Sequence, residues 1–130
     1  MAKRIREKTA KIAENRENRP HAVARYIRIS PFKVRPVLDA VRGKSVNEAL
    51  SILAVMPKAA SEVTHKLISS AVANAENNLG MARADLVVAE IYADGGPILK
   101  RVQPASKGRA YRINKRTSHI TVILDQKEVK

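Results

Sequence analysis

The sequence has no cysteine and no tryptophan, and only four of its 130 residues are aromatic. Without cysteine the chain cannot form a disulfide scaffold, a thiolate metal site or a cysteine nucleophile, and it fits a reducing compartment. No run of eighteen apolar residues occurs, so no segment is expected to span a membrane. The first twenty residues lack the apolar stretch of a signal peptide. At 45% apolar residues, the chain is long enough for one domain with one modest core.

Acidic side chains are scarce: twelve Asp and Glu stand against twenty-five Lys and Arg, for a net charge of +13. The excess is segregated along the chain. Residues 45–95 are slightly acidic, whereas residues 1–44 carry thirteen basic and four acidic side chains, and residues 96–119 carry seven basic and no acidic ones. Segregated positive charge indicates a polyanionic partner more strongly than total charge does. The plainer alternative is a basic, solvated surface.

Periodic apolar residues predict one strand and three helices, over residues 22–29, 31–42, 46–55 and 58–79. Ser30 followed by Pro31 is a start signal for the first helix. Ser45 and Glu48 form a capping box that opens the second. Pro36 cannot donate a backbone hydrogen bond to the preceding turn, so we expect a kink or an irregular first turn there.

Residues 1–20 contain few apolar side chains with no clear period, so we interpret them as a basic, flexible extension. Residues 21–130 then form a single domain. Its two late β-rich segments, 86–92 and 120–124, flank about 27 residues without a helical stripe, which predicts a long β-hairpin arm over about residues 86–124. The expected fold is α+β: a small globular domain of three helices packed on a short antiparallel sheet, with a long protruding β-hairpin.

The arm is too long to pack on its own domain. A strand from residue 86 to a tip near residue 106 can reach on the order of 65 Å at about 3.3 Å per residue, whereas the radius of gyration of a compact chain of this length is about 14 Å. An isolated two-stranded ribbon is marginal in water, so a partner is expected to hold it. A flexible basic loop without a fixed binding surface is the alternative. The partner's negative charge is indicated by seven arm cations: Lys100, Arg101, Lys107, Arg109, Arg112, Lys115 and Arg116.

The scarcity of aromatic residues makes base stacking on single strands a poor fit. No zinc-ligand set, homeodomain helix or basic zipper is present. These exclusions leave contact with phosphates and 2′-hydroxyls of a folded RNA, although composition alone does not separate RNA from DNA.

No residue pattern supports catalysis. The three histidines, His21, His65 and His119, lie far apart in the sequence and outside metal-ligand spacing. Asp85, Glu90 and Asp94 are better explained as solvated strand charges than as a cation site, and no acid–base pair stands out. We therefore expect no enzyme, no cofactor and no metal.

Five motifs, in order, resemble one protein family. They are residues 29–35 (ISPFKVR), 41–44 (VRGK), 70–78 (SAVANAENN), 96–101 (GPILKR) and 115–121 (KRTSHIT). Their order and spacing, over about residues 21–125, resemble bacterial-type large-subunit ribosomal protein twenty-two, the universal uL22 family. The sequence departs from the family at the tip, where Ala105 and Ser106 follow the proline instead of arginine. It also has Gly95 where an acidic residue is usual, and Pro36 where an aliphatic one is usual.

The resemblance implies a structural constituent of the large ribosomal subunit that binds 23S-type rRNA and supports early assembly. The hairpin would thread inward between RNA domains, and its tip would help line the nascent-polypeptide exit tunnel. The implied partners are large-subunit rRNA, neighbouring large-subunit proteins and the nascent polypeptide in transit, with no membrane and with one copy as a monomer within the ribosome. The implied location is a cytoplasmic ribosome, with an organellar ribosome left open.

The same resemblance assigns residue roles. It implies rRNA contact at Lys33, Arg35, Arg42, Lys44, Asn74, Asn78, Lys100, Arg101, Lys107, Arg109, Arg112, Lys115, Arg116, Thr117 and His119. It maps the tunnel-lining tip to Pro104, Ala105, Ser106, Lys107, Gly108, Arg109 and Ala110.

Two other classes of function compete with this one. An architectural DNA-binding protein with a β-arm would dimerise through a spare apolar helix face, and none is evident. A basic nucleic-acid-processing enzyme would need a carboxylate cluster that the sequence does not suggest. Affinity for large-subunit RNA and for duplex DNA at matched salt separates the first two classes, and turnover of either nucleic acid would support the third.

Overall fold

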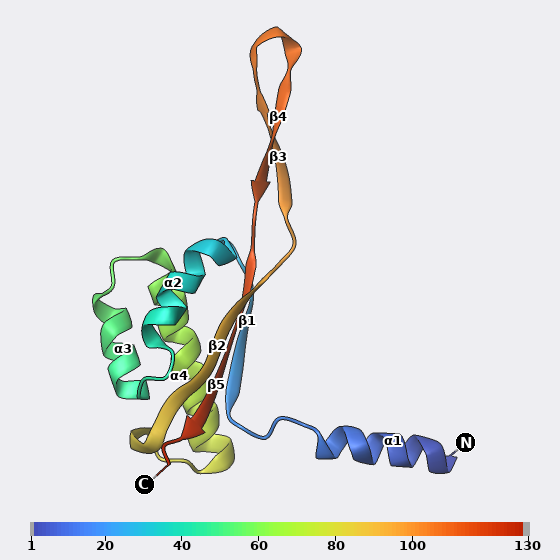
Figure 1. Cartoon of the computed structure of the whole chain (residues 1–130), viewed down its shortest axis with the longest axis vertical. Helices are drawn as coiled ribbons and strands as arrows, with labels where there is room; N and C mark the ends of the chain where they lie inside the picture. Colours follow the sequence, from blue (N-terminus) through green and yellow to red (C-terminus); the bar gives the residue numbers. More distant parts are fainter. Residues whose placement is uncertain (1, 129–130) are drawn as a thin grey trace.

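The computed structural model describes residues 2–128 (Figure 1). Short 3-10 turns at Arg83–Asp85 and Ser106–Gly108 supplement nine longer elements. These are α1 (Ala2–Glu14), β1 (His21–Ile27), α2 (Pro31–Val41), α3 (Val46–Val55), α4 (Ala59–Leu79), β2 (Leu86–Gly95), β3 (Leu99–Pro104), β4 (Ala110–Lys115) and β5 (Ser118–Gln126). The predicted α+β class, with three helices packed on an antiparallel sheet and a long hairpin, is confirmed.

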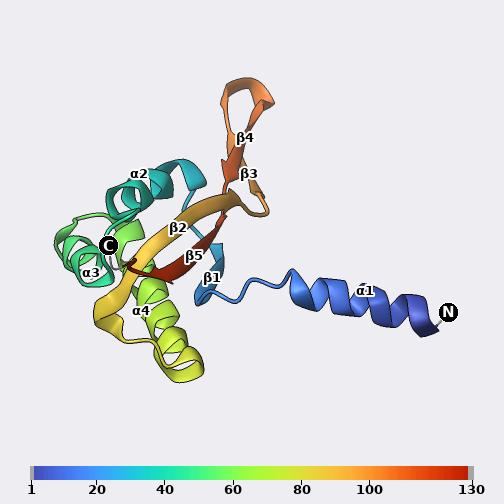
Figure 2. The same cartoon turned by 60° about the horizontal axis from the view of Figure 1, so that its bottom comes forward.

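The body is a two-layer sandwich. β1, β5 and β2 form an antiparallel sheet in that order, and α2, α3 and α4 lie against one of its faces (Figures 1 and 2). Alternate residues of the central strand, Ile120, Val122 and Leu124, are fully buried among the helices, as the two-residue period of a strand requires. On the helix side, Leu38 and Ile68 are equally buried, so one continuous apolar core joins all these elements.

Local signals place the helices close to where the sequence predicts them. The Ser45 hydroxyl accepts a hydrogen bond from the Glu48 backbone N–H at 3.4 Å and so caps α3. Gly80 ends α4 with a φ of +63°. α2 runs without interruption through Pro36, so the helix tolerates the missing donor of the ring nitrogen.

The arm consists of two ladders with a joint between them. Pairing of β2 with β5 ends at Gly95 and Ser118, and pairing of β3 with β4 begins at Leu99 and Lys115. Three residues on the outgoing side, 96–98, therefore face two on the return side, 116 and 117. This extra residue is a β-bulge, which bends and twists a ribbon. Beyond the joint, the ribbon leaves the body and projects alone (Figure 1).

The N-terminal segment differs from the prediction. Residues 2–14 form a regular helix, although the sequence pattern suggested an extension without helical periodicity. None of the α1 residues is buried, and the helix points away from the body (Figures 1 and 2). The apolar period is weak because α1 packs on no core, while its Ala, Lys, Arg and Glu residues have high intrinsic helix propensity.

Candidate nucleic-acid interface

The arm presents positive charge on both of its faces. Strand pairing places Arg101 and Lys115 on one face of the β3–β4 ribbon, and Lys100 and Arg112 on the other, because side chains alternate between faces. A protein that lies on a flat polyanion needs cations on one face only. The two-sided distribution suits an arm with negative charge on both sides.

The arm cations have no acidic partner within the chain. Every ion pair among residues 2–128 lies outside the segment 96–119, which itself contains no acidic residue. All seven arm cations are exposed. Like charges on a narrow ribbon repel one another, so a polyanion that neutralises them stabilises the arm as it binds.

The tip is a tight turn at the predicted place. Lys107 and Gly108 both have positive φ, at 60° and 70°, and the Arg109 N–H donates to the Ser106 carbonyl at 3.4 Å. Two consecutive positive φ values are characteristic of a type I′ turn, whose twist matches that of a two-stranded ribbon. The turn places Lys107 and Arg109 at the far end of the arm.

A basic groove lies where the arm meets the body. It has a volume of about 510 Å³ and runs between the chain that enters α2 and the end of β4. Four cations and no carboxylate line it; the full lining is Arg28, Ile29, Ser30, Lys33, Ala59, Ile113, Asn114, Lys115 and Arg116. The resemblance pointed to three of these cations but missed Arg28. Its charge, next to the 29–35 motif, was the available signal, but only the fold brings it near Lys115.

Two predicted contact residues also support the sheet. The Arg42 guanidinium donates to the Ile91 carbonyl at 2.9 Å and pairs with Asp39 at 2.6 Å. Arg35 donates to the Ala93 carbonyl at 3.3 Å. β2 is an edge strand, and unpaired edge carbonyls invite aggregation unless something covers them. Both arginines therefore protect this edge, and their guanidinium groups are already committed to hydrogen bonds.

Other predicted contact residues hold the joint and the opposite edge. The Asn74 amide donates to the His21 carbonyl at 3.0 Å on strand β1. His119 Nδ1 accepts the Tyr26 backbone N–H at 3.0 Å, and the two rings pack edge to face at 5.0 Å. Thr117 is only 4% exposed and donates its hydroxyl to the Pro97 carbonyl at 2.7 Å. Direct RNA contact by the Thr117 side chain is therefore the least supported of the predicted roles.

The remaining body residues of the predicted set differ in availability. Lys44 pairs with Glu48 at 2.9 Å. Lys33 and Asn78 are exposed, and neither side chain makes a hydrogen bond or ion pair elsewhere in residues 2–128. Lys33 is thus free to bind a ligand. The arm cations have no acidic partner, although Arg101 donates to the Lys100 carbonyl at 3.0 Å.

Other kinds of site lack support in the described part of the chain. Between residues 2 and 128 there is no group of three or more His, Asp or Glu side chains that could hold a metal ion. Glu90, considered above as part of a cation site, instead accepts a hydrogen bond from Arg19 at 2.9 Å. No described helix combines the length and the apolar character needed to cross a bilayer.

The structure defines a small α+β protein whose projecting β-arm carries exposed cations on both faces. Comparison with protein families makes this specific: the model of the family described as ribosomal protein L22p/L17e matches residues 22–125. A relative from Clostridium kluyveri, "Large ribosomal subunit protein uL22", is 57% identical over 107 residues, which are 82% of this chain and 96% of the relative. The protein of the same name from Clostridium tetani matches with the same identity and coverage. The chain belongs to the ribosomal protein L22p/L17e family, and the resemblance seen in its motifs is confirmed.

The family match does not include the N-terminal segment of the chain. Helix α1 and the linker after it precede residue 22, where the family match begins. Since 96% of each of these relatives is aligned, neither has enough unaligned sequence for a counterpart of a 13-residue helix. α1 therefore lies outside the residues that the family model matches, and these two relatives have no counterpart of its length.

Proposed function

We propose that this chain is a structural, non-catalytic constituent of the large ribosomal subunit that binds 23S-type rRNA and supports early assembly. The observation that carries the proposal is the projecting ribbon with unpaired cations on both faces. Family membership supports it, as does the name of the relatives, which places those proteins in the large subunit. The chain acts as a monomer beside rRNA and neighbouring large-subunit proteins, in a cytoplasmic ribosome.

The proposed mechanism is equilibrium binding. Cations of the arm replace condensed counterions on RNA phosphates, and each replacement releases ions to solution. The groove at the base holds Arg28, Lys33, Lys115 and Arg116 around one hollow. It thus provides a second place for phosphates, at the point where the arm direction is set.

The shape of the molecule suits a role that joins the surface of the subunit to its interior. The body can remain outside the RNA while the ribbon inserts, because the ribbon extends well beyond the helices (Figure 1). In this arrangement the tip residues 104–110 reach deepest, and they help line the exit tunnel beside the nascent polypeptide. Ala105 and Ser106 leave the tip with small side chains, so Lys107 and Arg109 provide its charge.

The test is a double substitution in the arm, Arg101→Ala with Arg116→Ala, assayed on purified 23S-type rRNA over a range of salt. With about seven phosphate contacts, log affinity of the unaltered chain should fall with log salt at a slope of roughly −5 to −6. The double variant should bind more weakly, with a slope shallower by about 1.4 to 1.8, because it loses two contacts. Its body should unfold at an unchanged temperature, since both residues lie outside the core.

The matched control removes two cations elsewhere, by Lys66→Ala with Lys127→Ala. Both residues are exposed and lie away from the arm, on α4 and after β5. This variant should keep most of the affinity and slope. Equal losses in the two double variants, or equal affinity of the unaltered chain for duplex DNA at the same salt, would contradict the proposal.

A further inference from the structure

Helix α1 has no partner within the chain. Its side chains are all exposed, including Ile5 and Ile12 at 63% and 64%. Both views show it extending sideways from the end of the body that lies away from the arm tip (Figures 1 and 2). An isolated helix of this length is marginal in water, so its persistence in the functional protein requires a surface to bind.

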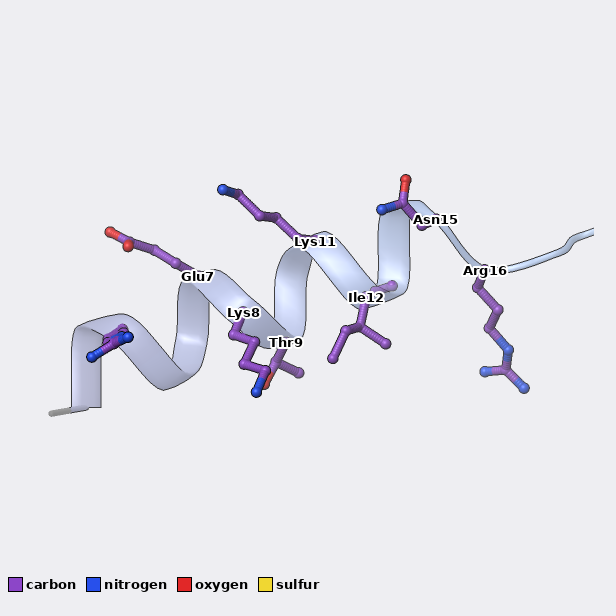
Figure 3. A pocket seen from close by; sticks show the side chains of 9 residues that line it. Glu7, Lys8, Thr9, Lys11, Ile12, Asn15 and Arg16 are labelled. Carbon is purple, nitrogen blue, oxygen red and sulfur yellow. The ribbon is translucent and has the colours of Figure 1, made fainter.

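Arg4, Lys8 and Lys11 form a basic stripe along α1, which Asn15 extends just beyond the end of the helix and beside which Glu7 lies. Arg4, Lys8, Lys11 and Asn15 follow one another at helical spacings of four, three and four residues, which places these positions along one side of the helix. Figure 3 shows Lys11 and Asn15 projecting from one side together with Glu7, whereas Lys8 projects toward the side of Thr9 and Ile12 in that view. Within residues 2–128 none of the three stripe cations makes an ion pair.

Part of the charge distribution of α1 opposes its folding in water. The first turn contains no acidic residue, and Lys3 and Arg4 stand there instead, against the positive end of the helix dipole. Arg4 and Lys8 are like charges four residues apart, which destabilises a helix, whereas Glu7 with Lys11, and Lys11 in the last turn, offset part of these costs. A polyanion along this side would remove both penalties, whereas a neutral partner would remove neither.

The apolar side is too small for a lipid surface. Ile5 and Ile12 are the only large apolar side chains of α1, and helices that lie on membranes bring Trp, Phe or Leu on a wide apolar face. Asn15, at the end of the stripe, can hydrogen-bond phosphate or 2′-hydroxyl oxygens. These features favour a nucleic-acid backbone as the occupant.

The segment that connects α1 to β1 is fixed to the body. The Arg19 guanidinium bonds Glu17 and Glu90, each at 2.9 Å, and approaches Asp125 at 3.9 Å. The Leu124 N–H donates to the Pro20 carbonyl at 2.8 Å. Only a short linker separates this anchor from the last turn of the helix, so once the body is bound, α1 meets nearby RNA at high effective concentration.

We propose that α1 is a second RNA-docking element, outside the residues that the family model matches, whose Arg4–Lys8–Lys11–Asn15 stripe binds the backbone of large-subunit rRNA beside the end of the body opposite the arm tip. This inference rests on the proposed function for the identity of the RNA. It adds a contact that the residues matched by the family do not supply.

Two full-length double variants of equal net charge test it on purified 23S-type rRNA. Arg4→Gln with Lys8→Gln removes two stripe cations, and Lys3→Gln with Arg6→Gln removes two from the other sides of the helix. Lys, Arg and Gln have similar helix propensities. The stripe variant should lose several-fold in affinity and make the salt slope shallower by about 1.4 to 1.8. The control variant should lose less than half of that slope, and α1 amides should gain exchange protection on rRNA in the control but not in the stripe variant.

Equal effects of the two variants would show diffuse attraction and overturn the proposal, as would no effect of either. Binding of the unaltered chain to anionic vesicles that is abolished by the stripe substitutions, with rRNA affinity unchanged, would assign α1 to a membrane surface and also overturn it. Weaker incorporation into the large subunit with unchanged affinity for bare rRNA would assign it to a protein partner, again overturning it. Both variants keep the arm intact, so failure of the proposed function would be recognised separately, as absent rRNA binding by the unaltered chain.

Discussion

At the scale of single residues, the joint of the arm depends on one glycine. Gly96 donates its N–H to the Thr117 carbonyl at 2.9 Å, and a Cβ built on Gly96 would collide with the Thr117 hydroxyl oxygen. That oxygen cannot move away freely, because it also donates to the Pro97 carbonyl and is buried. The close approach of the two strands therefore requires a residue without a side chain.

Gly96→Ala should consequently destabilise the protein by about 1–3 kcal/mol, the usual range for overpacking a well-filled site. Gly95→Ala is the matched control, since a Cβ there meets nothing within 4 Å. It should be neutral, or stabilising by up to about 1 kcal/mol through a less flexible unfolded chain. Urea unfolding of both variants measures the difference, and equal stability of the two would show that the joint tolerates a side chain.

Glu17 and Arg19 provide a second residue-scale test. Hydrogen bonds from Arg19 lower the pKa of Glu17 from 4.5 to about 2. A lowered carboxyl pKa means that the interaction is complete above the ordinary value near 4.5 and is lost as pH falls through about 2. In an NMR titration Glu17 should have its midpoint near 2, and Arg19→Gln should return it toward 4.5. Lys66→Gln, which removes the partner that lowers the pKa of Glu62, should leave the pKa of Glu17 unchanged. A Glu17 midpoint near 4.5 in the unaltered chain would contradict the hydrogen bonds between Glu17 and Arg19.

At the scale of elements, the backbone conformation of the tip turn disfavours a lysine at position 107, whereas the role of the tip favours its charge. Its φ of 60° is unfavourable for a residue with a side chain, yet its charge is useful at the end of the arm. Lys107→Val should cost about 1–2 kcal/mol in the turn, because a β-branched residue fits the left-handed region worst. The loss should appear as faster amide exchange in β3 and β4 while the melting temperature of the body stays constant. Lys107→Asn should keep the turn and weaken rRNA binding only; unchanged exchange in the valine variant would argue against the type I′ geometry.

The elements of the body were predictable because each leaves a local mark in the sequence. Pro31, the Ser45 cap and Gly80 set helix boundaries by chemistry that acts within a few residues, whereas the Ser30 side chain makes no cap hydrogen bond to α2. The bulges did not leave such a mark. An extra residue at Ala89, where the β2–β5 register shifts, follows from how two distant strands meet. The α1 helix was missed for a different reason: a helix without a core shows no wide apolar stripe.

At the scale of the whole molecule, part of the candidate site could likewise be predicted from the sequence and part could not. The arm cations could be identified from the sequence, because a segment rich in cations and free of acids is a local property. The groove could not, since Arg28 and Lys115 meet only through the fold. The resemblance assigned RNA contact to Arg42 and Thr117 as well, but hydrogen bonds to Ile91 and Pro97 show that they also hold the sheet edge and the joint. A shared motif combines binding and structural needs, and coordinates are required to distinguish them.

The molecule as a whole should show two levels of stability. β5 is covered by helices and lies between two strands, whereas β3 and β4 pair only with each other and have just Leu99 and Ile113 half-buried. Such a ribbon opens without unfolding the body. In the free protein, amides of β3 and β4 should therefore be measurably protected but much less so than those of β5, whose protection should approach the value set by global unfolding. Binding of rRNA should slow exchange of the arm amides.

The substitution Ile120→Ala tests whether the stability of the body and the stability of the arm are independent. Ile120 is fully buried in the central strand, so the substitution should lower the free energy of unfolding by about 2–5 kcal/mol and speed exchange in β5 by the corresponding factor. Arm exchange in the free protein should not change, because local opening of the arm leaves the core intact. On rRNA the arm of this variant should still become protected, provided that the body remains folded. Two results would contradict this picture: amides of β3 and β4 as protected as those of β5 in the free protein, or arm amides that lose protection together with β5 in the Ile120→Ala variant. Either result would mean that the arm folds as part of the core and that its cations need no polyanion to hold them.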